Sequence, residues 1–337
     1  MARTYQFTVG SAEAGLRLDH YLTRHLPTEL SRAVIQRGIR QGTVTVGGRP
    51  GKASHRLRGN DVIAAHFEHL PSRSGDTPLT PQEIPLDIAY EDAHLLVVNK
   101  PPGLVTHPAP GHWDGTLVNA LVWHFEQGNG LREEQPPRAG IVHRLDKETS
   151  GLLLVAKTAV VHTALSRQLK ARTIRRRYLA LVEGHPPLNI GTINVPVGRH
   201  PTHRKVMSVR HLGGRSAVTH YRVVKRFATE ALCSTLLEVA LDTGRTHQIR
   251  VHMAHLGHPV VGDATYGRYP ASHWQALGVT RQLLHAFRLS FLHPVLRKEL
   301  SVSAPIPEDM MRWLDAEAVA RLEHLADKPV KTGGTHP

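Results

Sequence analysis

A polar segment at residues 69–85, HLPSRSGDTPLTPQEIP, separates two parts of the chain that must each bury a core of their own. It is rich in Pro, Ser, Thr and Gly and has no periodic spacing of apolar residues, which is typical of a flexible linker. The 337 residues of the chain are enough for more than one domain. We therefore expect a small domain at residues 15–68, a main domain at residues 86–318 and a disordered polar tail at residues 325–337.

The small domain is expected to contain a helix with one basic side. Within LSRAVIQRGIRQG, the apolar residues Ile35 and Ile39 lie four positions apart, which is the spacing of an amphipathic helix. We expect Ser31 to cap the start of this helix and Gly42 to follow its end. A tight glycine turn and a strand at residues 61–67 follow it.

The main domain mixes strands and helices. Helices are expected at residues 116–125 and at residues 160–171, where Val161, Leu165 and Leu169 recur every four residues. Because strands and helices alternate without a regular βαβ rhythm, the pattern favours a mixed-sheet α+β fold over a doubly wound one. The apolar strand candidates lie at residues 95–98, 152–156, 178–182, 218–224 and 232–241.

The charge of the chain indicates a polyanionic partner. Lys and Arg number 42 against 28 Asp and Glu, so the formal net charge is +14 and the sequence pI is about 10.3. Neutralising phosphates releases condensed counterions, which makes nucleic acid a natural partner for such a chain. Basic stretches at residues 170–178 and 198–209 fit either RNA contact or a solvated surface. The basic residues that we expect to contact RNA are Arg32, Arg37, Arg40, Arg175 and Arg176.

Other residue types argue against a secreted, membrane-spanning or metal-dependent protein. The single cysteine, Cys233, cannot form an internal disulfide, which suits a reducing compartment. The N-terminus has no signal-peptide core, and no apolar run reaches the roughly 18–20 residues of a membrane span. His247, His252 and His255 lie close together, but the chain has no HExxH zinc motif. We expect a cytoplasmic protein without a membrane span or a metal.

The densest group of reactive side chains lies in AGIVHRLDKETSGLLLVAKT, residues 139–158. Its polar centre runs from His143 to Glu148 between two apolar stretches. Where solvent is scarce, a neighbouring cation can hold a carboxylate such as that of Asp146 ionised. A solvated charge run at the tip of a hairpin would have the same pattern, so the residues alone leave both interpretations open.

A second candidate lies in LDTGRTHQIRVHMAHLGHPVVGD, residues 241–263. We expect a strand to end at Asp242, Gly244 to form a turn, and a helix to begin at Arg245. The N-terminus of a helix beside an arginine attracts an anion, either a phosphate or a carboxylate. An ordinary capped helix with a basic first turn would look the same.

Taken together, these stretches resemble the RluA-type family of pseudouridine synthases, over roughly residues 10–305. Four blocks appear in the family's order, and residues 198–223 further resemble the RluD branch, which acts on large-subunit ribosomal RNA. The N-terminal part, residues 15–67, is similar to a small alpha-L RNA-binding domain named after a ribosomal protein. The four blocks are KPPGLVTHP at residues 100–108, the HRLD stretch at residues 139–158, the Arg177-Tyr178 pair, and RTHQIR with residues 257–267.

The resemblance implies both a fold and a site. The fold is a mixed, mostly antiparallel sheet divided by a cleft, which agrees with the α+β interpretation. The family's catalytic aspartate falls on Asp146, and the arginine that fills the space left by the flipped nucleotide falls on Arg144. The tyrosine that stacks on the target base falls on Tyr178, and the arginine that pairs with the catalytic carboxylate falls on Arg245.

The implied reaction converts uridine to pseudouridine in large-subunit ribosomal RNA after the nucleotide is flipped out. It requires no redox change, so no cofactor or metal is expected, and we expect a monomer without an obligate protein partner. A glycoside hydrolase would usually need a second carboxylate, and nothing marks Glu148 as that acid. A non-catalytic RNA-binding or ribosome-assembly protein could share the fold and the charge. The set of Asp146, Arg144, Tyr178 and Arg245 is what favours the enzyme.

Overall fold

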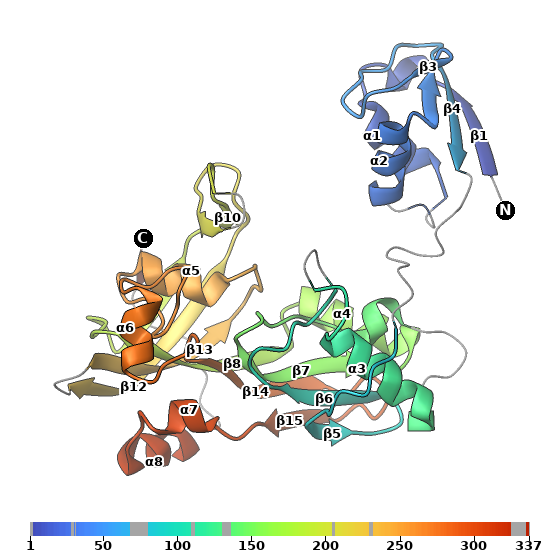
Figure 1. Ribbon diagram of the computed structural model, residues 1–337. Coiled ribbons are helices and arrows are strands. Elements are labelled where there is room, and N and C mark those ends of the chain that lie inside the picture. The colour runs from blue at the N-terminus through green and yellow to red at the C-terminus, as the bar shows by residue number, and fades with distance from the viewer. Residues whose placement is uncertain are drawn as a thin grey trace. The chain divides into compact units, whose positions relative to one another are not determined.

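The computed structural model consists of two compact units, Met1–Leu79 and Thr80–Pro337 (Figure 1). The structure describes residues 3–27, 30, 32–67, 80–108, 112–129, 136–203, 206–228, 232–324 and 335–336. The boundary between the units falls within the predicted linker, of which residues 69–79 lie outside the described residues. The remaining part, residues 80–85, is hydrogen-bonded to the large unit. Asn119 in helix α3 (Leu117–His124) donates to the carbonyl of Thr80 and accepts from the amide of Gln82.

The small unit is a four-stranded sheet with two helices. Its strands are β1 (Arg3–Thr8), β2 (Val44–Val46), β3 (Arg49–Pro50) and β4 (Val62–Phe67), in the order β1-β4-β2-β3. The 3-10 turn η1 (Ser11–Glu13) and the helices α1 (Leu18–His25) and α2 (Arg32–Gln41) complete it. The predicted start at residue 15 is wrong, because β1 pairs with β4 along its whole length and Tyr5 and Phe7 pack against the core.

Helix α2 confirms the amphipathic pattern of the small unit. Ile35 and Ile39 are buried in the core, whereas Arg37 and Arg40 are exposed on the surface. Gly42 follows the helix with a φ of 77°, in the left-handed region that favours glycine. The predicted cap Ser31 and the side chain of Arg32 lie outside what the structure describes.

The large unit is built on a ten-stranded sheet in the described part of the chain. The order is β16-β9-β12-β13-β8-β14-β7-β6-β5, with β15 also paired to β14, and only the β14–β7 and β16–β9 pairs are parallel. The sheet is therefore mixed and mostly antiparallel, as expected. Its strands are β5 (Ile88–Glu91), β6 (Leu95–Lys100), β7 (Ser150–Ala156), β8 (Arg175–Glu183), β9 (Ile190–Asn194), β12 (Val218–Ala228), β13 (Cys233–Leu241), β14 (Leu284–Leu292), β15 (Glu299–Ser303) and β16 (Thr335–His336).

Helices cover this sheet where the sequence pattern places apolar faces. Helix α3 begins with a capping box between Thr116 and Asn119, and α4 (Ala159–Lys170) begins with Thr158 accepting from the amide of Val161. Both helices were predicted to within one or two residues at each end. The other helical elements are η2 (Phe125–Asn129), η3 (Pro137–Gly140), α5 (Gln248–His255), α6 (Ala271–Ala276), α7 (Glu308–Met311) and α8 (Ala316–His324).

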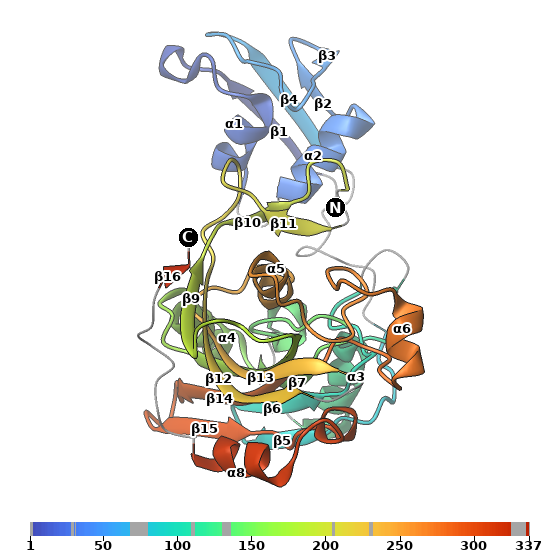
Figure 2. The same cartoon turned by 90° about the vertical axis from the view of Figure 1, so that its left-hand side faces the viewer.

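A separate hairpin stands outside the large sheet. Its strands β10 (Val197–Arg199) and β11 (Met207–Val209) pair antiparallel and project beyond helix α5 (Figure 2). Val197, Ala217 and Val251 form a small buried cluster that joins the base of this hairpin to α5. The basic stretch predicted at residues 198–209 is therefore an arm of the large unit.

The large unit extends beyond its predicted end at residue 318. Helix α8 runs to His324, and its residues Ala318 and Leu322 are buried in the core. Most of the predicted disordered tail lies outside the described residues, but Thr335–His336 pairs with β9. Among the helices that the structure describes, none is long and apolar enough to cross a membrane.

Three buried histidines make the large unit sensitive to acid. Burial lowers the pKa of His143 to about 3 and the pKa values of His252 and His285 to about 4, from an ordinary value of 6.5. Between pH 6.5 and about 4, the unfolded chain binds protons that the folded chain does not bind. The free energy of unfolding therefore falls as the pH falls through this window and rises again as the pH returns to neutral.

We expect His252→Gln to weaken this pH dependence. His252 alone accounts for about 2 kcal/mol of the free energy of unfolding lost at pH 5 relative to neutral pH. Thermal unfolding at pH 5 and pH 8 measures the difference in Tm between the two conditions. His255→Gln is the matched control, because His255 is exposed on the same helix. The same Tm difference in wild type and in both variants would contradict the prediction.

Candidate active site

Asp146 lies in the wall of a cavity of about 420 Å³. Its side chain is 16% exposed, so this carboxylate is largely shielded from solvent, although the neighbouring Arg144 and Lys147 are exposed. The volume falls in the range of about 300–1,000 Å³ that is typical of small-ligand sites. The cavity is lined by Val105, Thr106, His107, His112, Arg144, Leu145, Asp146, Lys147, Glu148, His247, Arg250, Ala264, Thr265 and Gln282.

The turn that carries Asp146 is fixed by the segment after β6. Lys100 is fully buried, and its ammonium donates to the carbonyls of Pro101, Leu104 and Lys147 at 2.7 to 3.0 Å. Thr106 donates to the carbonyl of Leu145 at 2.8 Å. Burial lowers the pKa of Lys100 to about 8. The KPPGLVT stretch thus holds the main chain on both sides of Asp146.

A glycine at the start of β7 sets where this turn meets the sheet. Gly151 pairs with Ala286 of β14 and has a φ of 109°. A Cβ atom at this position would lie 2.3 Å from the carbonyl oxygen of Ala286, a distance that no side chain can occupy. Only glycine allows the two strands to approach so closely directly after the Asp146 turn.

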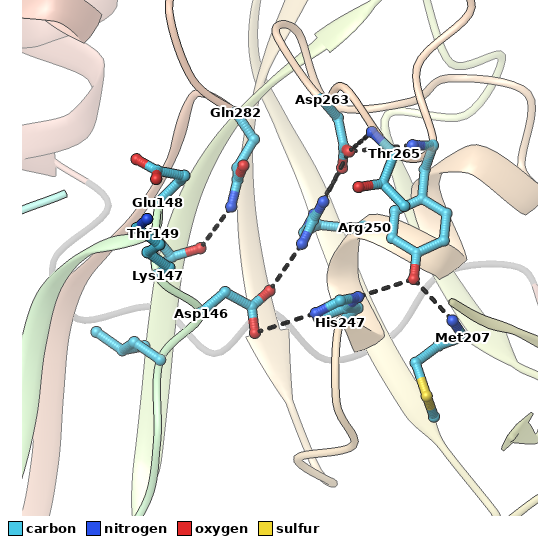
Figure 3. A network of polar contacts seen from close by, with 12 residues as sticks. Asp146, Lys147, Glu148, Thr149, Met207, His247, Arg250, Asp263, Thr265 and Gln282 are labelled. Carbon is cyan, nitrogen blue, oxygen red and sulfur yellow. Dashed lines mark hydrogen bonds and ion pairs between the residues drawn. The ribbon is translucent and has the colours of Figure 1, made fainter. Parts of the chain in front are cut away.

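The Asp146 carboxylate pairs with Arg250, which projects from helix α5 (Figure 3). The Arg250 Nη1 donates to Asp146 Oδ2 at 3.2 Å, while Nε and Nη2 donate to the two oxygens of Asp263 at 2.6 and 2.8 Å. Arg250 is 7% exposed and Asp263 is fully buried. Burial opposes the charge of Arg250, but the hydrogen bonds and charge of Asp263, together with Asp146, outweigh it and raise the Arg250 pKa.

The predicted partner Arg245 is not the arginine that contacts Asp146, so this pairing was wrong. The Arg245 side chain donates instead to the carbonyl of Ser216 at 3.1 Å. The reason lies in where the helix begins. Helix α5 starts at Gln248, after His247 in a left-handed conformation, so Arg245 lies before the helix and only Arg250 projects from it toward the cavity. Arg250 belongs to the same RTHQIR motif, but its spacing alone did not distinguish it from Arg245.

His247 extends the polar network away from Asp146 (Figure 3), and Tyr266 continues it. The His247 Nε2 lies 3.9 Å from Asp146 Oδ1, and its Nδ1 lies 2.8 Å from the Tyr266 hydroxyl. The same hydroxyl accepts from the amide of Met207 in β11 at 3.0 Å. Burial lowers the pKa of His247, with Asp146 opposing and Arg250 adding to the shift. Sequence patterns did not identify these residues as part of the site.

Arg144 and Tyr178, which the resemblance also implied, differ in whether they line the cavity. Arg144 is exposed and lines the cavity. Tyr178 in β8 is 5% exposed and is absent from the cavity lining. Burial raises the Tyr178 pKa, Arg176 opposes the shift, and the nearby charge of Asp146 adds to it. Stacking of Tyr178 on a bound base stays a prediction.

Two arginines that were predicted to contact RNA, Arg175 and Arg176, lie against other parts of the protein. Arg175 forms an ion pair with Glu299 of β15, which lies on the other side of β14. Arg176 is buried, 9% exposed, against the turn at Gly244. Arg176 therefore does not belong to an exposed basic surface, because alternation along β8 turns it inward.

The histidines considered as metal ligands do not converge. His252 contacts Thr219 and the carbonyl of Val195, whereas His247 faces Tyr266 and Asp146. Within the described ranges, no group of three or more His, Cys, Asp or Glu side chains is arranged to hold a metal ion.

Comparisons with known proteins identify the family of the chain. The family model for RNA pseudouridylate synthase matches residues 94–255, which include Asp146, Tyr178 and Arg250. Ribosomal large subunit pseudouridine synthase D of Xanthomonas campestris is 44% identical over 331 residues, covering 95% of each chain. The chain belongs to the pseudouridine synthase family. The protein of the same name from Escherichia coli is 41% identical over 335 residues, covering 96% of this chain and 98% of that one.

Within the pseudouridine synthase family, the chain falls in the RluD branch of the RluA-type members, as its motifs implied. Human RNA Pseudouridylate Synthase Domain Containing 1 has a structure similar to 74% of this chain and 97% of its own, with a TM-score of 0.56 and 30% identity. The predicted family and the predicted α+β fold are both confirmed.

Proposed function

We propose that this pseudouridine synthase isomerises specific uridines in large-subunit ribosomal RNA, with Asp146 as the catalytic carboxylate. The observation that carries the proposal is the pairing of Asp146 with the buried Arg250 at the wall of a nucleoside-sized cavity. The names of its relatives, which act on the large ribosomal subunit, support the choice of RNA.

The reaction needs one carboxylate in a dry, fixed position. The bond between ribose C1′ and uracil N1 breaks, the base turns, and C1′ bonds to C5, which loses its proton while N1 gains one. Atoms and electrons balance without an oxidant or reductant. Arg250 is held by Asp263 in a bidentate pair, so it orients the Asp146 carboxylate without moving during the reaction.

Access to the uridine requires base flipping, which costs a few kcal/mol. Arg144 is exposed at the cavity and lies two residues before Asp146, so it is placed to fill the space that the flipped nucleotide leaves. Stacking on Tyr178 would return about 1–3 kcal/mol of that cost. Arg144 and Tyr178 thus assist the extrusion of the nucleotide, whereas Asp146 and Arg250 carry out the chemistry.

The RNA is held by surfaces outside the cavity. The exposed Arg37 and Arg40 of helix α2 support an RNA-binding role for the small unit. The proposal includes action as a monomer without an obligate protein partner. A cytoplasmic location follows from the proposed substrate.

Mapping pseudouridines in ribosomal RNA tests the proposal. Cells lacking this gene should lose specific pseudouridines of large-subunit RNA, and the full chain should restore them. A complete pseudouridine map in cells without the gene would overturn the proposed substrate. In the same cells, residues 80–337 alone should restore fewer positions or restore them more slowly, because the small unit recruits RNA. Equal restoration by both forms would contradict that role.

A further inference from the structure

The β10–β11 hairpin belongs to a stretch of the chain that contains no acidic residue. From residue 184 to residue 229 there is neither Asp nor Glu, whereas the hairpin region from residue 195 to residue 217 carries five Arg or Lys. Arg199, His203 and Arg215 are exposed in this region. Such a stretch attracts phosphates, because its positive charges are not interleaved with acidic residues along the chain.

The hairpin is joined to the active site through Tyr266. Met207 and Val209 of β11 pack with Tyr266 around the buried cluster on α5. The Met207 amide donates to the Tyr266 hydroxyl at 3.0 Å. The ring of Tyr266 also lies under the Arg250 guanidinium, with 5.0 Å between Cζ and the ring centroid. Tyr266 therefore contacts both the hairpin and the arginine that holds Asp146.

The next step of the network runs through His247. Because the Tyr266 oxygen accepts from Met207, its own hydrogen is available to Nδ1 of His247, 2.8 Å away. A neutral imidazole that accepts at Nδ1 carries its hydrogen on Nε2. That nitrogen faces Asp146 Oδ1 at 3.9 Å (Figure 3), which is about 1 Å longer than an ordinary N–H···O hydrogen bond.

The backbone of His247 supports a functional reason for this arrangement. Its φ is 56° and its ψ is 21°, in the left-handed region that is unfavourable for a non-glycine residue. Such strain persists when the surrounding contacts determine the conformation, and it gathers at active sites. Here it turns the imidazole between Tyr266 and Asp146.

We propose that Tyr266 and His247 form a relay through which the β10–β11 hairpin, when it binds RNA, positions the Asp146 carboxylate. RNA binding shifts β11, and the hydrogen bond from the Met207 amide moves Tyr266 with it. The distance between His247 Nε2 and Asp146 Oδ1 then shortens. His247 and Tyr266 are positioning residues in this scheme, since they act through Asp146. The inference rests on the proposed function of Asp146.

Tyr266→Phe tests the relay, because it removes only the hydroxyl that joins Met207 to His247. With a ribosomal RNA transcript, we expect the single-turnover rate at saturating enzyme to fall about tenfold, or about 1.4 kcal/mol. The Kd for the RNA should stay within about twofold of wild type. Tyr269→Phe is the matched control, because it removes the same hydroxyl group from a tyrosine that is exposed on the surface three residues away.

A double-mutant cycle with the hairpin tests the coupling itself. In the wild-type background, Arg199→Ala with Arg215→Ala should raise the Kd and also lower the saturating rate. In the Tyr266→Phe background, the same pair should raise the Kd equally but lower the rate no further. Rate losses that multiply instead would show that hairpin and relay act independently, and would overturn the proposal.

The remaining outcomes are also decisive. If Tyr266→Phe lowers the Tm, His247→Asn repeats the test, because asparagine tolerates the left-handed backbone; His255→Asn is its control. Wild-type rates in both Tyr266→Phe and His247→Asn would overturn the relay alone. If the wild-type protein forms no pseudouridine in the transcript, the proposed function fails, and the relay fails with it.

Discussion

Asp146→Asn should abolish pseudouridine formation while leaving RNA binding nearly intact. Asparagine has almost the same shape, but it can act neither as a nucleophile nor as a base, and it cannot form the ion pair with Arg250. We expect a loss of about 10³-fold or more in the single-turnover rate. The Kd for RNA should change by less than about threefold, because phosphate contacts dominate affinity.

Glu148→Gln provides the comparison for this result. Glu148 lines the same cavity two residues further along the chain, but the ion pair with Arg250 is made by Asp146. We expect Glu148→Gln to retain most of the activity. A comparable loss in Glu148→Gln would indicate chemistry that uses two carboxylates, whereas full activity of Asp146→Asn would remove Asp146 from the catalytic role.

Arg250→Lys should lower the rate by about 10²-fold, even though it preserves the positive charge. A lysine has no planar fork, so it cannot hold Asp263 in a bidentate pair and reach Asp146 at the same time. The negative charge of the buried Asp263 would then be only partly neutralised, and we expect a lower Tm as well. Single-turnover kinetics and thermal unfolding measure the two effects.

Arg245→Lys is the matched control, because both arginines belong to the RTHQIR motif. The Arg245 guanidinium donates to the carbonyl of Ser216 and does not contact Asp146, so we expect a rate within about threefold of wild type. The opposite ranking, with a severe effect at Arg245 and a mild one at Arg250, would restore the pairing implied by the sequence resemblance.

Much of the architecture could be predicted because it depends on local periodicity. Apolar stretches located strands β6, β7, β8, β12 and β13, and the four-residue spacing of Val161, Leu165 and Leu169 located α4. Strand β1 was missed because its pairing partner β4 lies about 60 residues away, at Val62–Phe67. Residues 80–85 resembled a linker in composition, yet Asn119 binds their backbone.

The choice between Arg245 and Arg250 shows where local reasoning ends. Both arginines stand in one motif, and a helix N-terminus beside Arg245 was a sound expectation. The left-handed conformation of His247 delayed the start of α5 to Gln248. Neither that backbone conformation nor the position of Asp263 could be derived from spacing, because both depend on contacts between segments distant in the chain.

The sequence by itself determined the α+β class, the family and the candidacy of Asp146, because these depend on residue order and local pattern. Only the tertiary structure decided which groups surround that carboxylate. The groups come from three segments, which packing of the sheet and α5 brings together. Lys100 ends β6, His247 and Arg250 lie at the start of α5, and Asp263 and Tyr266 lie in the turn that follows α5. Burial then makes their mutual hydrogen bonds and charges strong enough to hold Asp146 in one position.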